Sequence, residues 1–161
     1  DSNRFINTII CNTDEEIIKI NDDSNNRIKH FHCNIKREIN LINDFKCLIK
    51  ILKIVKNQKP DVIHCHSAKS GILGRIIGFI TGTKTFYTPH AYSYLSAESK
   101  TKYIFLRSIE RFFSILPSTT LACSNSEYKR AIRDLKIKKD KVKVWSNSIE
   151  NRIISTNNRG D

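Results

Sequence analysis

The sequence predicts an α/β domain of the Rossmann-like, doubly wound kind, with a parallel sheet covered by helices on both faces. Short β-branched and apolar runs alternate with longer segments whose apolar residues recur at helical spacing. The 161 residues are enough for one such domain and too few for two ordinary ones. A domain of this size buries roughly two thirds of its unfolded surface, so it needs no disulfide to be stable.

The first third of the chain begins with two expected strands. They lie at residues 5–11 and 27–34, where β-branched and aromatic side chains concentrate. The acidic, polar stretch 14–23 between them is expected to form a short helix.

A long helix is expected at residues 41–57, and Pro60 follows its end. Apolar side chains recur there at intervals of three and four: Leu41, Phe45, Leu48, Leu52 and Val55. The lysines of this segment form a separate stripe, as on a solvated face.

The alternation continues to residue 145. Further strands are expected at residues 61–65, 84–88, 119–123 and 141–145. Further helices are expected at residues 68–80, 97–116 and 124–135. Ser124 and Glu127 have the spacing of a capping box at the start of the last helix. Residues 1–150 are thus interpreted as one domain, and 151–161 as a linker or disordered tail.

Composition indicates anionic partners and a reducing compartment. The chain carries 28 basic and 16 acidic side chains, a net charge of +12, which favours nucleic acid, acidic lipid or phosphorylated molecules. A general bias toward Lys, Asn and Ile explains the same charge without any function. The five cysteines have irregular spacing, which is typical of a cytosolic protein. No apolar stretch reaches the roughly 18 residues of a membrane span.

Polar side chains follow two successive strands. One loop carries His66, Ser67 and Lys69, and the next carries His90 and Tyr92. Because ligands of parallel sheets bind at the carboxyl ends of the strands, these loops predict a binding or catalytic cleft. Pro89 stiffens the strand end before His90, which can donate, accept or carry charge near neutral pH. The structural alternative is a packed loop histidine.

The triplet His64-Cys65-His66 suggests zinc at first sight. On a strand, however, the two histidines share one face and Cys65 points the other way, so the three cannot easily share an ion. We therefore expect no metal, with His64 buried and hydrogen-bonded and His66 at the strand end.

The start of the helix after this strand offers free N–H groups, and Lys69 adds a charge, which suits a phosphate or carboxylate. The alternative is that Ser67 only caps the helix and Lys69 is a surface lysine. Glycines follow at intervals of three and four without the GxGxxG fingerprint, so they are interpreted as packing residues: Gly71, Gly74, Gly78 and Gly82.

An ordered set of motifs resembles the N-terminal domain of glycosyltransferase family 4 enzymes, the type that builds bacterial capsular and other surface polysaccharides. The motifs are Lys36-Arg37-Glu38-Ile39, then Asp44, the stretch from Lys59 to Arg75, Tyr87-Thr88-Pro89-His90, Ser124-Asn125-Ser126-Glu127, and Val144 to Glu150. The resemblance implies one half of a GT-B architecture. It also implies retaining transfer of a hexose from a nucleotide sugar, with no metal or other cofactor.

The resemblance assigns roles to individual residues. His90 falls on the family's cleft histidine, near the donor sugar and the acceptor hydroxyl. Acceptor contacts are expected from Arg37, His66, Ser67, Lys69, Gly71 and Tyr92. Asn147 falls on the turn before the interdomain linker. The expected acceptor is a glycan, free or polyprenyl-linked, and the expected location is cytoplasmic or peripheral on the inner membrane face.

Three departures from the family pattern stand out. Ala91 replaces the usual glycine after the histidine, and Ser148 replaces the glycine after Asn147. The opening strand, the glycine-rich loop and the donor-binding C-terminal domain are absent, so we expect the chain to be inactive alone. The alternatives are a basic module that binds anionic lipid or nucleic acid, and another GT-B-like enzyme such as a nucleotide-sugar epimerase. No RNA-binding or helix-turn-helix motif supports nucleic acid.

Overall fold

The computed structural model describes residues 6–13, 28–36 and 38–146. Its strands are β1 Thr8–Cys11, β2 Lys29–His32, β3 Val62–His66, β4 Lys84–Thr88, β5 Thr119–Ala122 and β6 Val142–Val144. Its helices are α1 Leu41–Gln58, α2 Ala68–Thr81, α3 Lys100–Phe113 and α4 Asn125–Arg133, with short 3-10 segments η2 Ser93–Ser96 and η3 Lys139–Lys141. The strand–helix alternation confirms the predicted α/β class. The expected helix at 14–23 and the tail at 151–161 lie outside the described residues.

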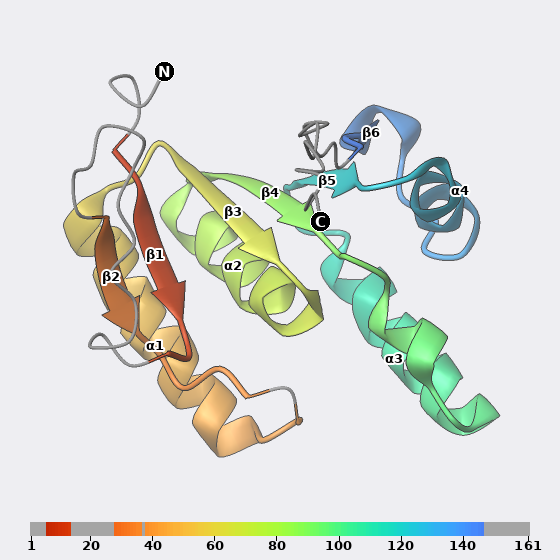
Figure 1. Ribbon diagram of the computed structural model, residues 1–161, viewed down its shortest axis with the longest axis horizontal. Helices are drawn as coiled ribbons and strands as arrows, with labels where there is room; N and C mark the ends of the chain where they lie inside the picture. The colour runs from red at the N-terminus through yellow and green to blue at the C-terminus, as the bar shows by residue number, and fades with distance from the viewer. Residues whose placement is uncertain (1–5, 14–27, 37, 147–161) are drawn as a thin grey trace, which may run out of the picture.

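The described strands pair in parallel, as predicted, but they form two sheets. One contains β1 and β2, and the other has the order β3-β4-β5-β6. β1 runs beside β3 in the same direction, and no ladder joins them among the described residues (Figure 1). A shared core connects the two sheets, since Ile10 of β1 and Ile63 of β3 both pack against buried residues of α1 and α2.

Helices α1, α2 and α3 form one layer behind the sheets (Figure 1). The glycines of α2 explain its close approach to β3 and β4. A Cβ atom would lie 2.3 Å from the Tyr87 ring at Gly71 and 2.0 Å from Cys65 Sγ at Gly74. Gly71, Gly74 and Gly78 are therefore packing residues, as the sequence predicted. Gly82 is not: a Cβ atom there would meet nothing within 4 Å, and the residue ends α2 with a φ of 71°. None of the described helices is long and apolar enough to cross a membrane.

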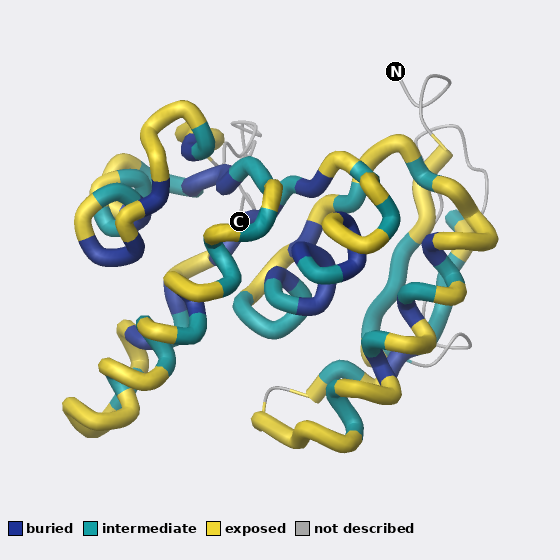
Figure 2. Tube along the Cα trace, turned by 180° about the vertical axis from the view of Figure 1, so that it is seen from behind, coloured by how far each residue is buried: buried dark blue, intermediate teal, exposed yellow. Residues whose placement is uncertain are grey.

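The buried face of α1 differs from the predicted stripe. Its buried residues are Cys47, Ile51 and Val55, whereas Leu41 and Phe45 are 79% and 63% exposed. In α3, Phe105 and Phe112 are likewise 54% and 66% exposed, and the buried residue of that helix is Glu110. Helical spacing identifies an apolar face but not the neighbour that covers it. Several apolar residues of both helices are exposed, and Figure 2 shows exposed segments along the chain.

A buried ion pair joins α2 to α3. Arg75 Nη2 lies 3.1 Å from Glu110 Oε2, and both side chains are at most 2% exposed. The Tyr87 hydroxyl donates to Glu110 Oε1 at 3.0 Å, and the Arg75 guanidinium stacks 4.5 Å from the Tyr87 ring centre. Arg75 Nε also donates to the Gly71 carbonyl at 2.9 Å. This network uses most of the polar atoms it buries, as a desolvated ion pair requires.

Candidate functional site

Three strand ends meet at the carboxyl edge of the larger sheet. His66 ends β3, His90 follows β4, and Cys123 follows β5. His66 Nδ1 lies 2.9 Å from His90 Nε2, with the two rings stacked at 17°. His90 Nδ1 lies 3.6 Å from Cys123 Sγ. Both histidines are exposed, so the structure brings the two predicted loops together at an accessible edge.

The hydrogen bond between the histidines requires one ring nitrogen to donate and the other to accept. Burial and then the neighbouring ring of His90 lower the pKa of His66. Burial, His66 and His90 likewise lower the pKa of His64. The rings of His64 and His66 are therefore neutral at pH 7. A neutral imidazole can donate a hydrogen bond to one ligand atom while accepting one from another.

His64 lies on the same side of β3 as His66, with ring centres 4.2 Å apart, and is exposed rather than buried as expected. It bonds the Thr88 hydroxyl at 2.9 Å. Cys65 points the other way, and burial raises its pKa to about 12, so its thiol is unreactive. Within the described ranges, no three His, Cys, Asp or Glu side chains are placed to share a metal ion.

The loops that carry these residues have strained backbones. Ser67, His90 and Ala91 have φ values of 70°, 48° and 72°, a region that side chains with a Cβ rarely adopt. The glycine that the family pattern places after the histidine would suit this conformation, and Ala91 adopts it nonetheless. Ser67 occupies the N-cap position of α2, but its side chain makes no capping bond.

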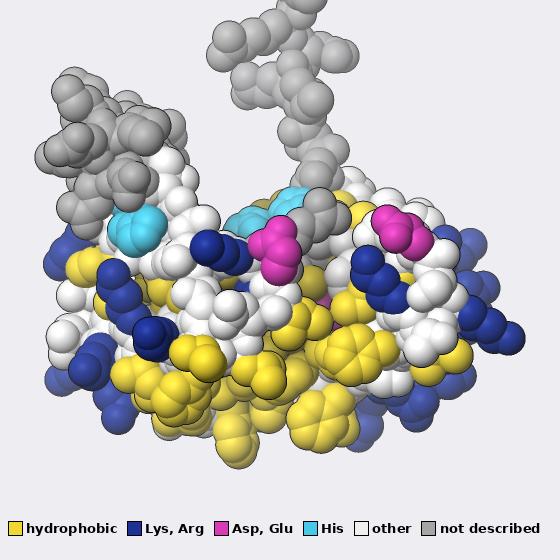
Figure 3. Space-filling model, turned by 90° about the horizontal axis from the view of Figure 1, so that it is seen from below, with side chains coloured by type: hydrophobic (Ala, Val, Ile, Leu, Met, Phe, Trp, Pro, Cys, Tyr) yellow, Lys and Arg dark blue, Asp and Glu magenta, His cyan; other side chains and the backbone are white. Residues whose placement is uncertain are grey.

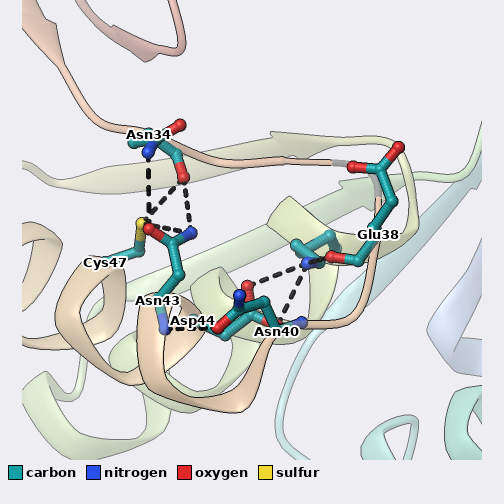
Figure 4. A network of polar contacts seen from close by, with 7 residues as sticks. Asn34, Glu38, Asn40, Asn43, Asp44 and Cys47 are labelled. Atoms are coloured by element: carbon teal, nitrogen blue, oxygen red, sulfur yellow. Dashed lines mark hydrogen bonds and ion pairs between the residues drawn. The ribbon is translucent and has the colours of Figure 1, made fainter.

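Lys69 is already paired. Its ammonium group donates to both carboxylate oxygens of Asp44, at 2.8 and 3.0 Å, and to the Glu38 carbonyl. Asn40 and Asn43 hold the same segment at the start of α1, where Asn40 Oδ1 accepts from the Asn43 N–H at 3.0 Å (Figure 4). Lys69, which the sequence suggested as a charge for a ligand, therefore links α2 to residues 38–44 instead.

Two residues that were predicted to contact the acceptor are not at the surface. Gly71 is buried beneath the Tyr87 ring, and Tyr92 is 1% exposed in the core. The family resemblance and the strand-end loop suggested these two contacts, but packing turns both residues inward. Arg37 and Asn147 lie outside the described residues.

Glu127 is a site residue that the sequence did not reveal. The Ser124 hydroxyl accepts from its N–H at 3.2 Å, which confirms the N-cap. Its carboxylate, however, does not close a capping box: Oε1 accepts from the Ala91 N–H at 2.6 Å, and Oε2 accepts from the Cys123 N–H at 2.8 Å. A capping-box pattern already explained this glutamate, so no sequence signal pointed to the loop of His90.

A parallel α/β sheet with polar side chains gathered at the carboxyl ends of its strands defines a Rossmann-like ligand-binding domain. The chain belongs to Glycosyltransferase Family 4, because the sequence model of that family matches residues 7–151. An Escherichia coli UDP-Gal:alpha-D-GlcNAc-diphosphoundecaprenol alpha-1,3-galactosyltransferase is 30% identical over 98% of this chain and 41% of its own. The capsular polysaccharide glycosyltransferase CapM of Staphylococcus aureus is 28% identical over 68% of this chain and 29% of its own. The chain thus spans less than half the length of these relatives.

Solved structures show the same fold. A glycosyltransferase from Rickettsia africae matches 76% of this chain and 30% of its own, with a TM-score of 0.54 and 21% identity. Anabaena Alr3699/HepE, solved with UDP, matches 76% of this chain and 31% of its own, with a TM-score of 0.55 and 16% identity. A UDP-N-acetylglucosamine 2-epimerase matches 71% of this chain and 32% of its own, with a TM-score of 0.52. The domain is therefore built like part of a GT-B enzyme, and the family match favours the transferase over the epimerase.

Proposed function

We propose that this domain is the acceptor side of a retaining glycosyltransferase that moves a hexose from a UDP-sugar to a lipid-linked glycan in surface polysaccharide synthesis. The observation that carries the proposal is the accessible pair of His66 and His90 at the carboxyl edge of the sheet. The activity for which the E. coli relative is named supports it, since that name pairs a UDP-sugar with a diphosphoundecaprenol-linked sugar.

In this proposal His90 lies at the reacting centre, where its ring bonds the acceptor or donor and stabilises developing charge. His66 shares a hydrogen bond with that ring and contacts acceptor hydroxyls. Ser67 and the first N–H groups of α2 receive the acceptor phosphate. We assign Lys69 to holding residues 38–44, because its charge is already matched by Asp44. Arg37 and Asn147 stay proposed as an acceptor contact and an interdomain turn.

The remaining parts of the enzyme are proposed from the same resemblance. We assign the donor nucleotide to the second domain of the GT-B architecture. No metal or other cofactor takes part in this scheme.

Calorimetry with two probes tests the proposal. The chain is expected to bind a short-chain polyprenyl diphosphate bearing GlcNAc and to give no heat with UDP-galactose. A His66→Ala/His90→Ala variant is expected to bind the acceptor probe at least about fivefold more weakly, since two ligand hydrogen bonds contribute roughly 1 kcal/mol or more in total. Binding of UDP-galactose but not of the acceptor probe would place the donor on this domain and overturn the proposal.

We further propose that the domain lies on the inner membrane surface as a peripheral protein. Large apolar side chains are exposed at the starts of two helices: Ile39, Leu41, Ile42 and Phe45 at α1, and Ile104 and Phe105 in α3. Exposed lysines accompany them at positions 46, 50, 100 and 102. Both helices begin at the end toward which the strands point, and apolar side chains gather on the helix side of that face (Figures 1 and 3). Apolar groups with flanking lysines suit an anionic bilayer.

Vesicle binding tests the membrane proposal. The Ile42→Ser/Phe45→Ser variant is expected to bind phosphatidylglycerol-containing vesicles about tenfold more weakly or worse, because each lost side chain removes up to roughly 1.5–3 kcal/mol of burial. The matched control is Phe79→Ser/Ile80→Ser. It changes two exposed side chains at the C-terminal end of α2, away from the starts of α1 and α3. Equal losses in both variants would argue against a docking face at the starts of α1 and α3.

A further inference from the structure

We infer that Glu127 is the positioning residue of His90: its buried carboxylate holds the strained turn after β4 against the end of β5 and so sets the direction of the histidine ring. The importance of that ring rests on the proposed function, whereas the contacts themselves do not. Glu127 is 9% exposed and comes from α4, 36 positions beyond Ala91.

The turn needs such a support. His90 and Ala91 are consecutive, both carry a Cβ atom, and both have positive φ values of 48° and 72°. Left-handed backbone is unfavourable for such residues and persists only where other contacts enforce it. The Ala91 N–H donates to Glu127 Oε1 at 2.6 Å, a short bond to a charged acceptor, and it lies within the strained pair itself.

The second oxygen of the same carboxylate fixes the other side of the site. Oε2 accepts from the Cys123 N–H at 2.8 Å, and the thiol of Cys123 lies 3.6 Å from His90 Nδ1. One side chain therefore anchors both the backbone beneath His90 and a neighbour of its ring. Once both are fixed, His90 Nε2 lies at 2.9 Å from His66 Nδ1. The Ser124 cap bonds the backbone N–H of Glu127, a contact separate from both bonds of the carboxylate.

A glutamine at position 127 separates this role from simple packing, because an amide has one acceptor oxygen and can hold only one of the two N–H groups. In the ¹⁵N-labelled chain, Glu127→Gln is expected to speed hydrogen exchange about tenfold or more at the Ala91 or the Cys123 amide, the effect of losing one hydrogen bond to a charged group. The ring nitrogen signals of His66 and His90 are expected to shift, while the amides of α1 stay unchanged. The matched control, Ser124→Ala, removes the cap but neither carboxylate contact and should leave both rings unmoved.

Rescue by glycine completes the test. Ala91→Gly accepts the positive φ without strain, so the Glu127→Gln/Ala91→Gly variant is expected to recover the wild-type ring signals. Unchanged His90 signals in Glu127→Gln, or no recovery in the double variant, would overturn the inference. If Glu127→Gln fails to fold, a folded double variant with wild-type ring signals supports it, and an unfolded double variant contradicts it. A wild-type chain that ignores the acceptor probe while these ring changes occur would overturn the proposed function alone.

Discussion

Replacing Arg75 with methionine is expected to lower the free energy of unfolding by about 3–5 kcal/mol, because the change leaves the Glu110 carboxylate buried without its counter-charge. Arg75 and Glu110 are each 1% exposed as residues, and their contact joins α2 to α3. The Tyr87 hydroxyl, the other described donor to Glu110, cannot replace a full positive charge. Urea unfolding followed by circular dichroism measures the effect as a shift of the midpoint at constant slope.

Two further variants make this stability prediction specific. Arg75→Met/Glu110→Met removes both charges and is expected to recover much of the loss, leaving a deficit of about 1–3 kcal/mol for the Tyr87 hydroxyl that then lacks its acceptor. Arg133→Met removes a cation that is 73% exposed, and Arg130 still lies 3.8 Å from Asp134, so the midpoint is expected to move much less than in Arg75→Met. A double variant less stable than Arg75→Met would show that the side-chain volumes, not the charges, dominate at this position.

Replacing His90 with alanine is expected to lower kcat of the complete transferase by about 10²–10³, the range found when one group that stabilises developing charge is removed. The bond to His66 holds the His90 ring at the exposed edge of the sheet, where the imidazole is available to the reacting groups. KM is expected to change much less than kcat, because the contact strengthens in the transition state. Steady-state transfer from UDP-galactose to the diphosphate-linked GlcNAc probe measures both constants.

His90→Gln and Lys84→Ala complete that comparison. The glutamine keeps one donor and one acceptor and is expected to retain more activity than alanine. Lys84 begins β4 at the opposite end of the strand, and its loss should leave kcat unchanged. A His90→Ala enzyme with undiminished kcat would remove His90 from the reacting centre.

The fold was predictable from the sequence wherever the signal is local. Proline, glycine and capping residues mark helix ends, so α1 and α2 lie within a residue or two of their expected bounds. The pairing of His66 with His90 was also foreseeable in outline, because the carboxyl ends of adjacent parallel strands meet at one edge.

The parts that failed depend on partners distant in the chain. Phe45 has helical spacing with buried residues, yet it faces solvent because its neighbours lie on the other side of α1. Arg75 and Glu110 are 35 positions apart, and neither has a sequence feature that marks a buried charge. Glu127 satisfied a local rule for helix starts, which concealed its contact with Ala91. Lys69 resembled a free cation, because the sequence does not show that Asp44 lies beside it.

The central claim is that this domain receives the acceptor at the His66–His90 pair. The most direct test is a titration of the chain with labelled histidine rings, followed by NMR, first with the diphosphate-linked GlcNAc probe and then with UDP-galactose. The account predicts saturable shifts of the His66 and His90 ring nitrogens with the acceptor probe, no shift of His32 at the end of β2, and no response to UDP-galactose. Ring shifts with UDP-galactose alone, or acceptor binding that leaves both rings unmoved, would contradict it.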